Sequence, residues 1–337
     1  MSITGAFSKD KKLEWRIITP ISDLSKEAVF YDVFDPTPDE VRCFTEKTGI
    51  TVPSQQDLGM SEVIRPFYKE NGVCYMTITV IHQTESSDYW ESSPLAFILS
   101  DRFLIMLSHV RLTILQIFFE RSRNNFEIYL DPDLLLTSII DVLINNIAVI
   151  LQDVGNDLDD LLKRLFVDEK NARPLSRITS NKYYDDIIEE IGLIGNVISK
   201  TRESLVSINR LILYYDQIEE NKDITQIRAR REQRLRLRHL SREISSLSEY
   251  AGFLSQRNSF LIDATLGMLS VEQNTIIKMF TVASAVLMPP TLIASIYGMN
   301  FNIMPELTWK FGYPLAIIMI IISALVPYFY FKKKNWL

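Results

Sequence analysis

Charged side chains are missing from two long stretches near the end of the chain. The first runs from Met279 to Pro305 and has 27 residues, and the second runs from Phe311 to Phe331 and has 21 residues. A helix needs about 20 predominantly apolar residues to cross a bilayer, so each stretch is long enough. The second stretch is apolar on every side, which argues against a pair of buried core helices. The expected segments are a first span over 271–297, a loop over 298–312, a second span over 313–331 and a basic tail over 332–337.

Two other apolar stretches contain polar side chains, and we assign them to a soluble part. Leu134–Leu151 includes Asp141, and Pro94–Phe119 includes Asp101 and Arg102. An Asp or Arg at the centre of a spanning helix costs roughly 2.5–3.5 kcal/mol, several times what one leucine returns. The N-terminus lacks the apolar segment of a signal peptide, so we expect no such leader.

Lysines flank the predicted spans on one side of the membrane. Lys278 precedes the first span and Lys332–Lys334 follow the second, whereas the connecting loop carries only Glu306 and Lys310. Because cytoplasmic flanks are enriched in Lys and Arg, both termini are expected to be cytoplasmic. The predicted location is the inner (plasma) membrane, where a multi-pass protein has the lipid bilayer as a partner.

The residues before the long helices have the pattern of a mixed domain. Short β-branched or aromatic runs, separated by turn residues, predict strands at Val73–Ile81, Leu95–Leu99 and Phe103–Leu107. Thr37, followed by a proline and acidic residues, predicts the start of a helix. We therefore expect an α+β cytoplasmic domain over 1–130.

Residues 131–270 repeat apolar positions at spacings of three and four, which predicts long cytoplasmic helices. Two of them are expected to be antiparallel. The third begins near Ile224 and meets no proline before Pro289, so it has roughly 70 residues and a length of about 100 Å at 1.5 Å per residue. It is therefore continuous with the first membrane span. A helix of this length needs partners along it, which implies homo-oligomerisation.

Composition and motifs exclude several classes of function. The formal net charge of −6 leaves no excess of cations for nucleic-acid phosphates, so no nucleic-acid partner is expected. Cys43 and Cys74 form no CxxC zinc site, and the three histidines share no metal-ligand spacing. The chain has 11 glycines but neither a phosphate-binding loop nor a G-x-S-x-G elbow. We expect no enzyme and look for the function in the membrane.

Seven arginines lie close together early in the third long helix. They are Arg228, Arg230, Arg231, Arg234, Arg236, Arg238 and Arg242. Such a cluster can bind nucleic acid or lipid, but no aromatic residues are interleaved with it. We favour a solvated or inter-helix face that is paired with acidic side chains. The acids expected to pair with it are Asp157, Asp159, Asp160, Glu189 and Glu190.

Polar and small residues follow one side of the predicted first span at spacings of three and four. This seam consists of Asn274, Ile277, Thr281, Ser284, Met288, Thr291 and Ser295. It collects every hydroxyl between Thr281 and Ser295 and no charged side chain, so a passing cation would meet dipoles only. Small and hydroxyl residues also mark ordinary membrane-helix interfaces. Several copies of this helix could surround a pore, and we predict that the seam lines it.

Two short motifs lie at the outer end of the first span. The span ends in Tyr297-Gly298-Met299-Asn300, and the following loop contains Met304-Pro305-Glu306-Leu307. Together with the basic tail and the stretch from Glu272 to Thr291, they resemble the CorA family of magnesium/cobalt ion channels, whose members have two transmembrane helices and a Gly-Met-Asn motif.

The resemblance implies a homopentameric funnel with a selectivity filter at Asn300, beside Tyr297, Gly298 and Met299. Mg²⁺ gives up its water reluctantly and is usually held through that water. A ring of carboxamide and backbone carbonyl oxygens can accept hydrogen bonds from such a hydrated cation. Gly298 is expected to turn the backbone with a φ that other residues resist. Glu306 would raise the cation concentration outside.

The resemblance also implies passive Mg²⁺ entry that is driven by the membrane potential and gated by intracellular Mg²⁺. The regulatory ion would bind carboxylates that converge between subunits. Candidates for these carboxylates are Glu243 and Glu249 on the long helix, and Asp88 and Glu91 in the acidic segment before it.

Two other functions stay open on the sequence. The chain could carry Co²⁺, Ni²⁺ or Zn²⁺, because the thioethers of Met288 and Met299 would suit a softer ion. Alternatively, it could be a membrane-anchored enzyme or sensor whose α/β domain performs the function. That protein would keep its function when its spans were exchanged for another anchor.

Overall fold

The computed structural model divides into two compact units. It describes residues 2–9, 12–17, 28–53, 58, 65–84, 89–122, 131–168, 180–220, 227–299, 309–334 and 336. The units are Met1–Pro174 with Asp186–Leu261, and Leu175–Asp185 with Ile262–Leu337. The helix α7 (Ile227–Tyr297) contributes residues to both.

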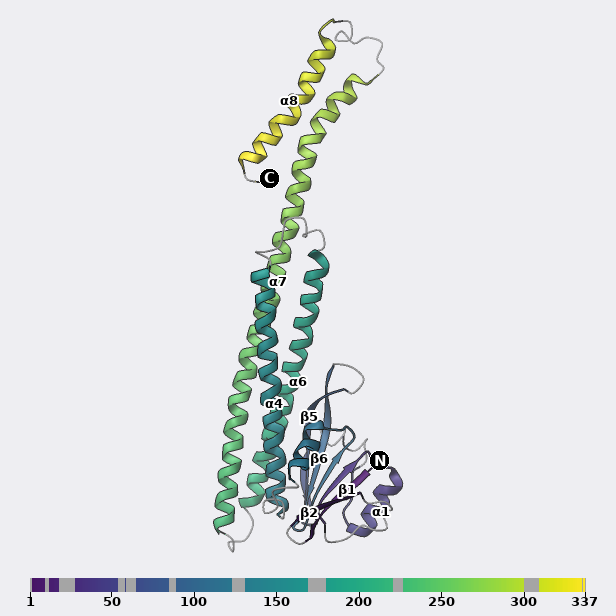
Figure 1. Ribbon diagram of the computed structural model, residues 1–337, viewed down its shortest axis with the longest axis vertical. Helices are drawn as coiled ribbons and strands as arrows, with labels where there is room; N and C mark the ends of the chain where they lie inside the picture. The colour runs from purple at the N-terminus through teal and green to yellow at the C-terminus, as the bar shows by residue number, and fades with distance from the viewer. Residues whose placement is uncertain are drawn as a thin grey trace. The chain divides into compact units, whose positions relative to one another are not determined.

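The first unit contains a seven-stranded sheet (Figure 1). Its strands are β1 (Ser2–Lys9), β2 (Lys12–Ile17), β3 (Ala28–Phe34), β4 (Phe67–Glu70), β5 (Val73–Gln83), β6 (Trp90–Leu99) and β7 (Leu104–Ser108). They lie in the order β2-β1-β3-β7-β6-β5-β4. Every neighbouring pair is antiparallel except β3 and β7, which are parallel. The three predicted strands are confirmed as β5, β6 and β7.

The helix predicted after Thr37 is also confirmed, as α1 (Pro38–Thr48). The backbone amide of Thr37 donates to the carboxylate of Glu40 at 2.8 Å, which satisfies an amide at the helix start. At the other end, Gly49 has a φ of 72°, and its amide donates to the carbonyl of Thr45 at 2.8 Å. A left-handed residue of this kind ends helices, and glycine adopts it without strain.

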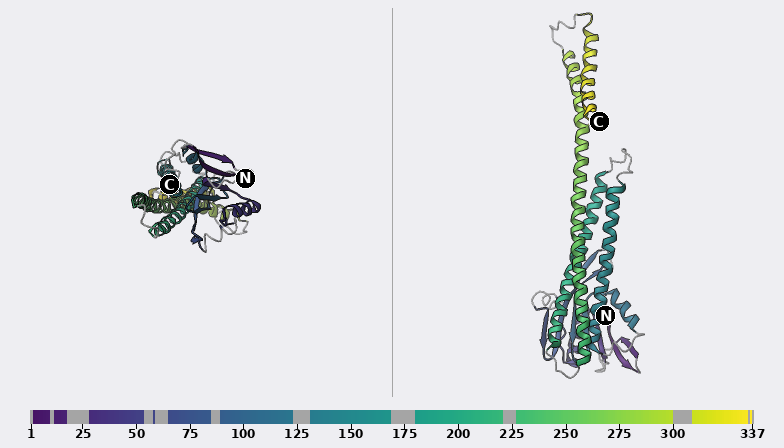
Figure 2. Two further views of the ribbon diagram at one scale, coloured as in Figure 1. Left: turned by 90° about the horizontal axis from the view of Figure 1, so that it is seen from below. Right: turned by 90° about the vertical axis from the view of Figure 1, so that its left-hand side faces the viewer.

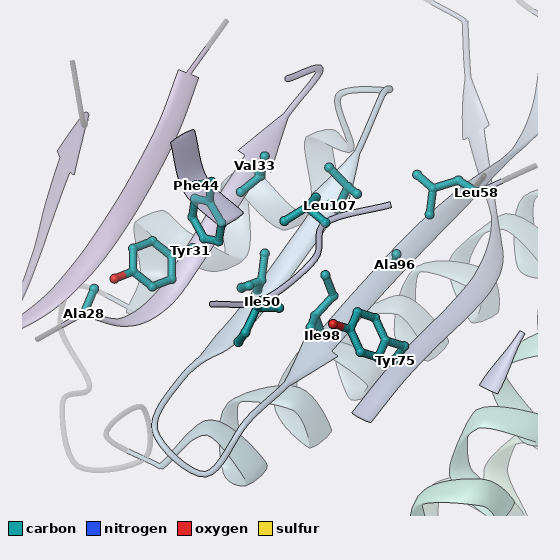
Figure 3. Packing of buried hydrophobic residues seen from close by; sticks show 12 residues of the cluster. Ala28, Tyr31, Val33, Phe44, Ile50, Leu58, Tyr75, Ala96, Ile98 and Leu107 are labelled. Carbon is teal, nitrogen blue, oxygen red and sulfur yellow. The ribbon is translucent and has the colours of Figure 1, made fainter. Parts of the chain in front are cut away.

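One face of the sheet carries an apolar core that includes α1 (Figure 3). Tyr31 and Val33 of β3 point to this face because alternate residues of a strand share a side. The ring of Tyr31 meets Phe44 of α1 edge-to-face at 5.5 Å, and it meets Phe103 in the same way. Ile98 and Ile105 continue the core across β6 and β7.

Long helices cover the other face of the sheet. They are α3 (Thr113–Ser122), α4 (Pro132–Lys163), the π-helical turn η3 (Arg164–Asp168), α6 (Ser180–Glu220) and the first part of α7. Helix α4 contacts β6 and β7 and runs beside α6 and α7 in both figures (Figures 1 and 2). Strand β4 pairs with β5 only as far as Met76. Further along β5, the backbone amide of Thr79 donates a hydrogen bond to the hydroxyl of Ser207 in α6 at 2.9 Å. The long helices and the α/β layer therefore belong to one compact unit.

A buried polar contact joins three of these helices. The fully buried hydroxyl of Tyr215 in α6 donates to the carboxylate of Asp133 in α4. It also accepts a hydrogen bond from the amide of Gln233 in α7 at 2.9 Å. Because buried polar groups are costly unless they are paired, this contact fixes the helices relative to one another at this level of the bundle.

Three helices are long and apolar enough to cross a membrane among the residues that the structure describes. These segments are Pro132–Phe166, Glu232–Tyr297 and Gly312–Lys333, the last being α8. Their most apolar windows differ in burial: 56% of the first is buried in the protein, against 6% of each of the other two. The burial of Pro132–Phe166 accounts for its apolar residues, because they pack against other elements of the first unit.

Candidate ion pathway

The predicted seam lies on the exposed part of α7 in the second unit. All seven of its residues are exposed, with Ile277 at 61% and Met288 at 70%. Covered positions recur elsewhere on the same helix, where Val282 is buried and Val286, Pro289 and Ile293 are half-buried. At 3.6 residues per turn, these covered residues and the seam lie on roughly opposite sides of α7. The seam is therefore available to other copies of the chain or to water.

The seam offers neutral oxygen atoms. The hydroxyl of Thr281 donates to the carbonyl of Ile277, and that of Thr291 donates to the carbonyl of Leu287, each at 2.7 Å. A hydroxyl that donates its proton to the helix keeps its lone pairs as acceptors. These two oxygens can therefore accept hydrogen bonds from the water shell of a cation without supplying a fixed charge.

Two consecutive prolines lie inside α7 at the level of the seam. Pro289 and Pro290 have no amide hydrogen, so the carbonyls of Ala285 and Val286 have no helical amide donor. Membrane helices tolerate this where water or a neighbouring group satisfies the carbonyl. The two carbonyls are thus further neutral acceptors.

The expectation for Gly298 is wrong in one respect. Its φ lies outside the left-handed region, because α7 ends by donating the Gly298 amide to the carbonyl of Ala294 at 3.0 Å. A Cβ at this position would lie 3.2 Å from the carbonyl oxygen of Ala294, so a larger residue would need a small shift of the helix end. Tyr297 is half-buried and Met299 is 49% exposed. Asn300 and Glu306 lie outside the described residues.

Three of the four candidate regulatory carboxylates lie among the described residues. Glu243 is 29% exposed and lies 3.9 Å from Nδ1 of His239, while Glu249 and Glu91 are exposed. Asp88 is outside the described residues. No group of three or more His, Cys, Asp or Glu side chains could hold a metal among the residues described.

Three of the five acids expected to pair with the arginine cluster pair with cations outside it. Asp159 pairs with Arg257, Asp160 with Lys163 at 2.9 Å, and Glu190 with Arg164 at 2.8 Å. The hydrogen bond from Arg257 lowers the pKa of Asp159. Arg257 lies more than four helical turns after the last arginine of the cluster. The pairing was predicted wrongly because the sequence does not show which turn of α7 lies beside Asp159 of α4.

Acidic side chains of α4 and α6 also lie close to one another, which the sequence analysis did not predict. Burial raises the pKa of Asp157, and the nearby charges of Asp153, Glu190 and Asp160 raise it further. Their spacing of three and four residues on α4 is visible in the sequence, but the approach of Glu190 from α6 is not.

Comparison with known proteins decides the family. A family model of CorA-like Mg²⁺ transporter proteins matches residues 25–333. The chain belongs to this family. The magnesium transport protein CorA of Salmonella typhimurium is 30% identical over 334 residues, which cover 99% of both chains. The CorA protein of Escherichia coli K12 is 29% identical over 333 residues, again covering 99% of each.

The fold agrees with a solved structure of the same family. The CorA magnesium transporter of Methanocaldococcus jannaschii matches with a TM-score of 0.72 and 18% sequence identity, over 100% of this chain and 99% of that one. At this identity the match concerns the fold alone. It extends over the sheet, the long helices and the apolar C-terminal helices of the CorA-like chain.

Proposed function

We propose that this chain is a transporter, not an enzyme, and that five copies form a channel for Mg²⁺ in the inner membrane. In each copy, the last part of α7 and α8 cross the bilayer as a hairpin, with both termini in the cytoplasm. The single observation that carries the proposal is the exposed, uncharged seam of α7 in a chain of the CorA-like family. Five such seams around one axis would enclose a path to which each chain contributes four hydroxyls, one carboxamide and one thioether.

The seam chemistry suits a hydrated divalent cation. Oxygens that only accept hydrogen bonds can hold the water shell of Mg²⁺ without stripping it, and Mg²⁺ dehydrates reluctantly. Carboxylates would bind more tightly and release the ion more slowly, whereas conduction needs binding weak enough to allow exit. At the outer mouth, five Asn300 side chains would present their oxygens in a ring, and Glu306 would attract cations to it.

The membrane potential is the driving force in this proposal. A divalent cation gains about 4.6 kcal/mol per 100 mV of inside-negative potential, twice the value for a single charge. Entry then needs no other energy source, but it needs a closing mechanism. We assign closure to intracellular Mg²⁺ bound between subunits by carboxylates, for which Glu243 and Glu249 on α7, together with Asp88 and Glu91, are the candidates.

A related cation is the second candidate. Met288 is 70% exposed on the seam, and a thioether is a better ligand for Co²⁺ or Ni²⁺ than for Mg²⁺. Met288→Thr would remove the sulfur and keep a polar side chain. Loss of Co²⁺ uptake with unchanged Mg²⁺ uptake in this variant would favour Co²⁺ as an additional cargo.

Growth of Mg²⁺-starved cells tests the proposed function. Cells that lack their own magnesium uptake should be rescued by the intact chain. They should not be rescued by a chimera in which both spans are replaced by an unrelated two-helix anchor. Rescue by the chimera would show that the α/β domain carries the function and would contradict transport.

A further inference from the structure

The C-terminal end of α8 combines aromatic rings with three lysines. Tyr328 and Tyr330 precede Lys332, Lys333 and Lys334, and Trp336 follows them. All three lysines are exposed. No Asp or Glu occurs in the sequence after Glu306, so this end of the second unit has a local excess of positive charge that its own segment does not neutralise.

The tail folds back onto the helix instead of leaving it. The amide of Lys334 donates to the carbonyls of Tyr330 and Phe331 at 3.2 and 3.1 Å, and the amide of Trp336 donates to the carbonyl of Phe331 at 3.2 Å. The indole of Trp336 also lies 5.4 Å from the ring of Phe331. These contacts hold the indole, which is 39% exposed, at the depth of the helix end.

Two of the lysines reach back toward the apolar part of the helix. The ammonium of Lys332 lies 5.9 Å from the ring centre of Tyr328, and that of Lys334 lies 5.3 Å from the ring centre of Tyr330. Each tyrosine precedes its lysine by four residues, so both ammoniums lie on the N-terminal side of their own backbones, over a ring of the preceding turn. A lysine at a membrane boundary ordinarily extends toward water.

The helix dipole alone does not account for this arrangement. The negative end of a helix attracts cations, but its carbonyls lie at the last turn, in the direction away from the tyrosine rings. A cation drawn to the level of Tyr328 and Tyr330 gains from attraction to the electron-rich faces of the rings themselves. It also comes to the depth where tyrosine and tryptophan side chains meet lipid headgroups.

We propose that this end of α8 binds the headgroups of anionic phospholipids in the cytoplasmic leaflet. The ammoniums of Lys332 and Lys334 pair with the lipid phosphates on two sides of the helix, because residues two positions apart point in nearly opposite directions. Lys333 adds charge between them. Tyr328, Tyr330 and Trp336 hold the lysines at headgroup depth. The site rests on the proposed membrane orientation of α8 and would tie each subunit to negatively charged lipid.

Quenching of Trp336 by brominated lipid tests the site in the full-length chain. A variant with Trp15→Phe, Trp90→Phe and Trp309→Phe leaves Trp336 as the only tryptophan. It is reconstituted in vesicles of equimolar phosphatidylcholine and phosphatidylglycerol, with bromine on one lipid or on the other. We expect phosphatidylglycerol to be enriched around Trp336 by about fivefold, the factor that one lysine supplies near an anionic surface. The enrichment should fall as ionic strength rises.

Charge variants separate this site from general membrane contact. Replacing Lys332, Lys333 and Lys334 by glutamine should remove the enrichment, while Lys310→Gln, at the other end of α8, should leave it unchanged. A chain that keeps only Trp309 serves as the control at that end and should show no preference between the lipids. Both sets of variants must elute from gel filtration as the parent does.

Two results would overturn the proposal in different ways. Equal quenching of Trp336 by both lipids would show that α8 reaches the membrane but selects no anionic lipid. That result would leave the proposed channel intact. Absence of quenching by either lipid would show that Trp336 is not at a membrane surface, which would contradict the proposed span as well.

Discussion

Gly195 of α6 faces Asn258 of α7 so closely that a Cβ added to the glycine would lie 2.9 Å from Nδ2 of the asparagine. Asn258 is buried, and its Oδ1 has no hydrogen-bond partner among the residues described. The distance between these two helices therefore depends on the missing side chain at position 195. Gly192, one turn earlier on α6, has open space where its Cβ would be.

These two glycines make a matched pair of mutants. Gly192→Ala should stabilise the chain by roughly 0.5–1 kcal/mol, because alanine loses less backbone entropy in a helix. Gly195→Ala should instead destabilise it relative to Gly192→Ala by about 1–3 kcal/mol, the usual cost of overpacking. Thermal unfolding of the detergent-solubilised proteins, followed by helical circular dichroism, measures the difference. Equal unfolding temperatures for the two variants would contradict a close α6–α7 contact.

Asp32 of β3 predicts a pH dependence of stability. Asp32 lies between the core residues Tyr31 and Val33 in the strand, so its side chain is on the opposite face of the sheet, the one that the helices cover. Burial there raises the pKa of Asp32 from 3.8 to about 7. At a pH between these two pKa values, the Asp32 carboxyl is protonated in the folded chain and ionised in the unfolded chain. Stability should therefore fall as pH rises from about 4 to 7, by about 4 kcal/mol for a shift of this size, and stay level above pH 7.

Asp32→Asn should remove this contribution and raise the unfolding temperature most at neutral and higher pH. The exposed Asp101→Asn is the control, and its pH profile should follow that of the parent. Denaturation scans at a series of pH values give the profile. An unchanged slope in Asp32→Asn would mean that the carboxyl at this position is not the group that titrates.

The seam of α7 can be tested by adding bulk at adjacent positions. Ser284 and Ala283 are both exposed, but only Ser284 belongs to the seam. Ser284→Leu should narrow a path formed by several copies and reduce Mg²⁺ flux at least tenfold, because five leucines would replace five small polar groups. Ala283→Leu should keep most of the flux. Fluorescent detection of Mg²⁺ in proteoliposomes compares them, and similar losses in both would argue against this choice of lining face.

Gating by intracellular Mg²⁺ predicts protection from proteolysis. An ion that binds one conformation stabilises it, so millimolar Mg²⁺ should slow cleavage of the intact protein. Neutralising the carboxylates that bind the ion, with Glu243→Gln and Glu249→Gln as the first pair, should remove this protection and leave flux insensitive to cytosolic Mg²⁺. Glu46→Gln on α1 is the control for Glu243→Gln and Glu249→Gln made singly, because each of the three changes the charge by one. If Mg²⁺ protects the parent no better than buffer, gating of this kind does not occur.

Elements that depend only on residues close together in the sequence could be predicted from it. Thr37 and Glu40 form the start of α1 through contacts within four residues. The second charge gap, Phe311–Phe331, matches α8 (Gly312–Lys333) to within two residues at each end. Spacing also indicated the seam, because the face of a helix follows from its period.

Features that depend on two distant segments could not be predicted in this way. The parallel pairing of β3 with β7 joins residues more than 70 positions apart, and the contact of Arg257 with Asp159 depends on how α7 is shifted along α4. The wrong expectation for the φ of Gly298 came from a local signal in the sequence. A glycine after a helix suggests a left-handed turn, but Gly298 instead continues the helical hydrogen bonding to the carbonyl of Ala294.

Mg²⁺ uptake by the purified protein under a membrane potential tests the central claim most directly. Proteoliposomes that contain the intact chain should take up Mg²⁺ when a potassium gradient makes their interior negative, and they should stop when the potential is removed. Asn300→Ala should abolish uptake while the protein assembles as before, and Asn300→Asp should bind the ion more tightly and change the competition between Mg²⁺ and Ca²⁺. Absence of potential-driven uptake by the intact chain, or equal uptake by Asn300→Ala, would contradict a channel with its filter at this residue.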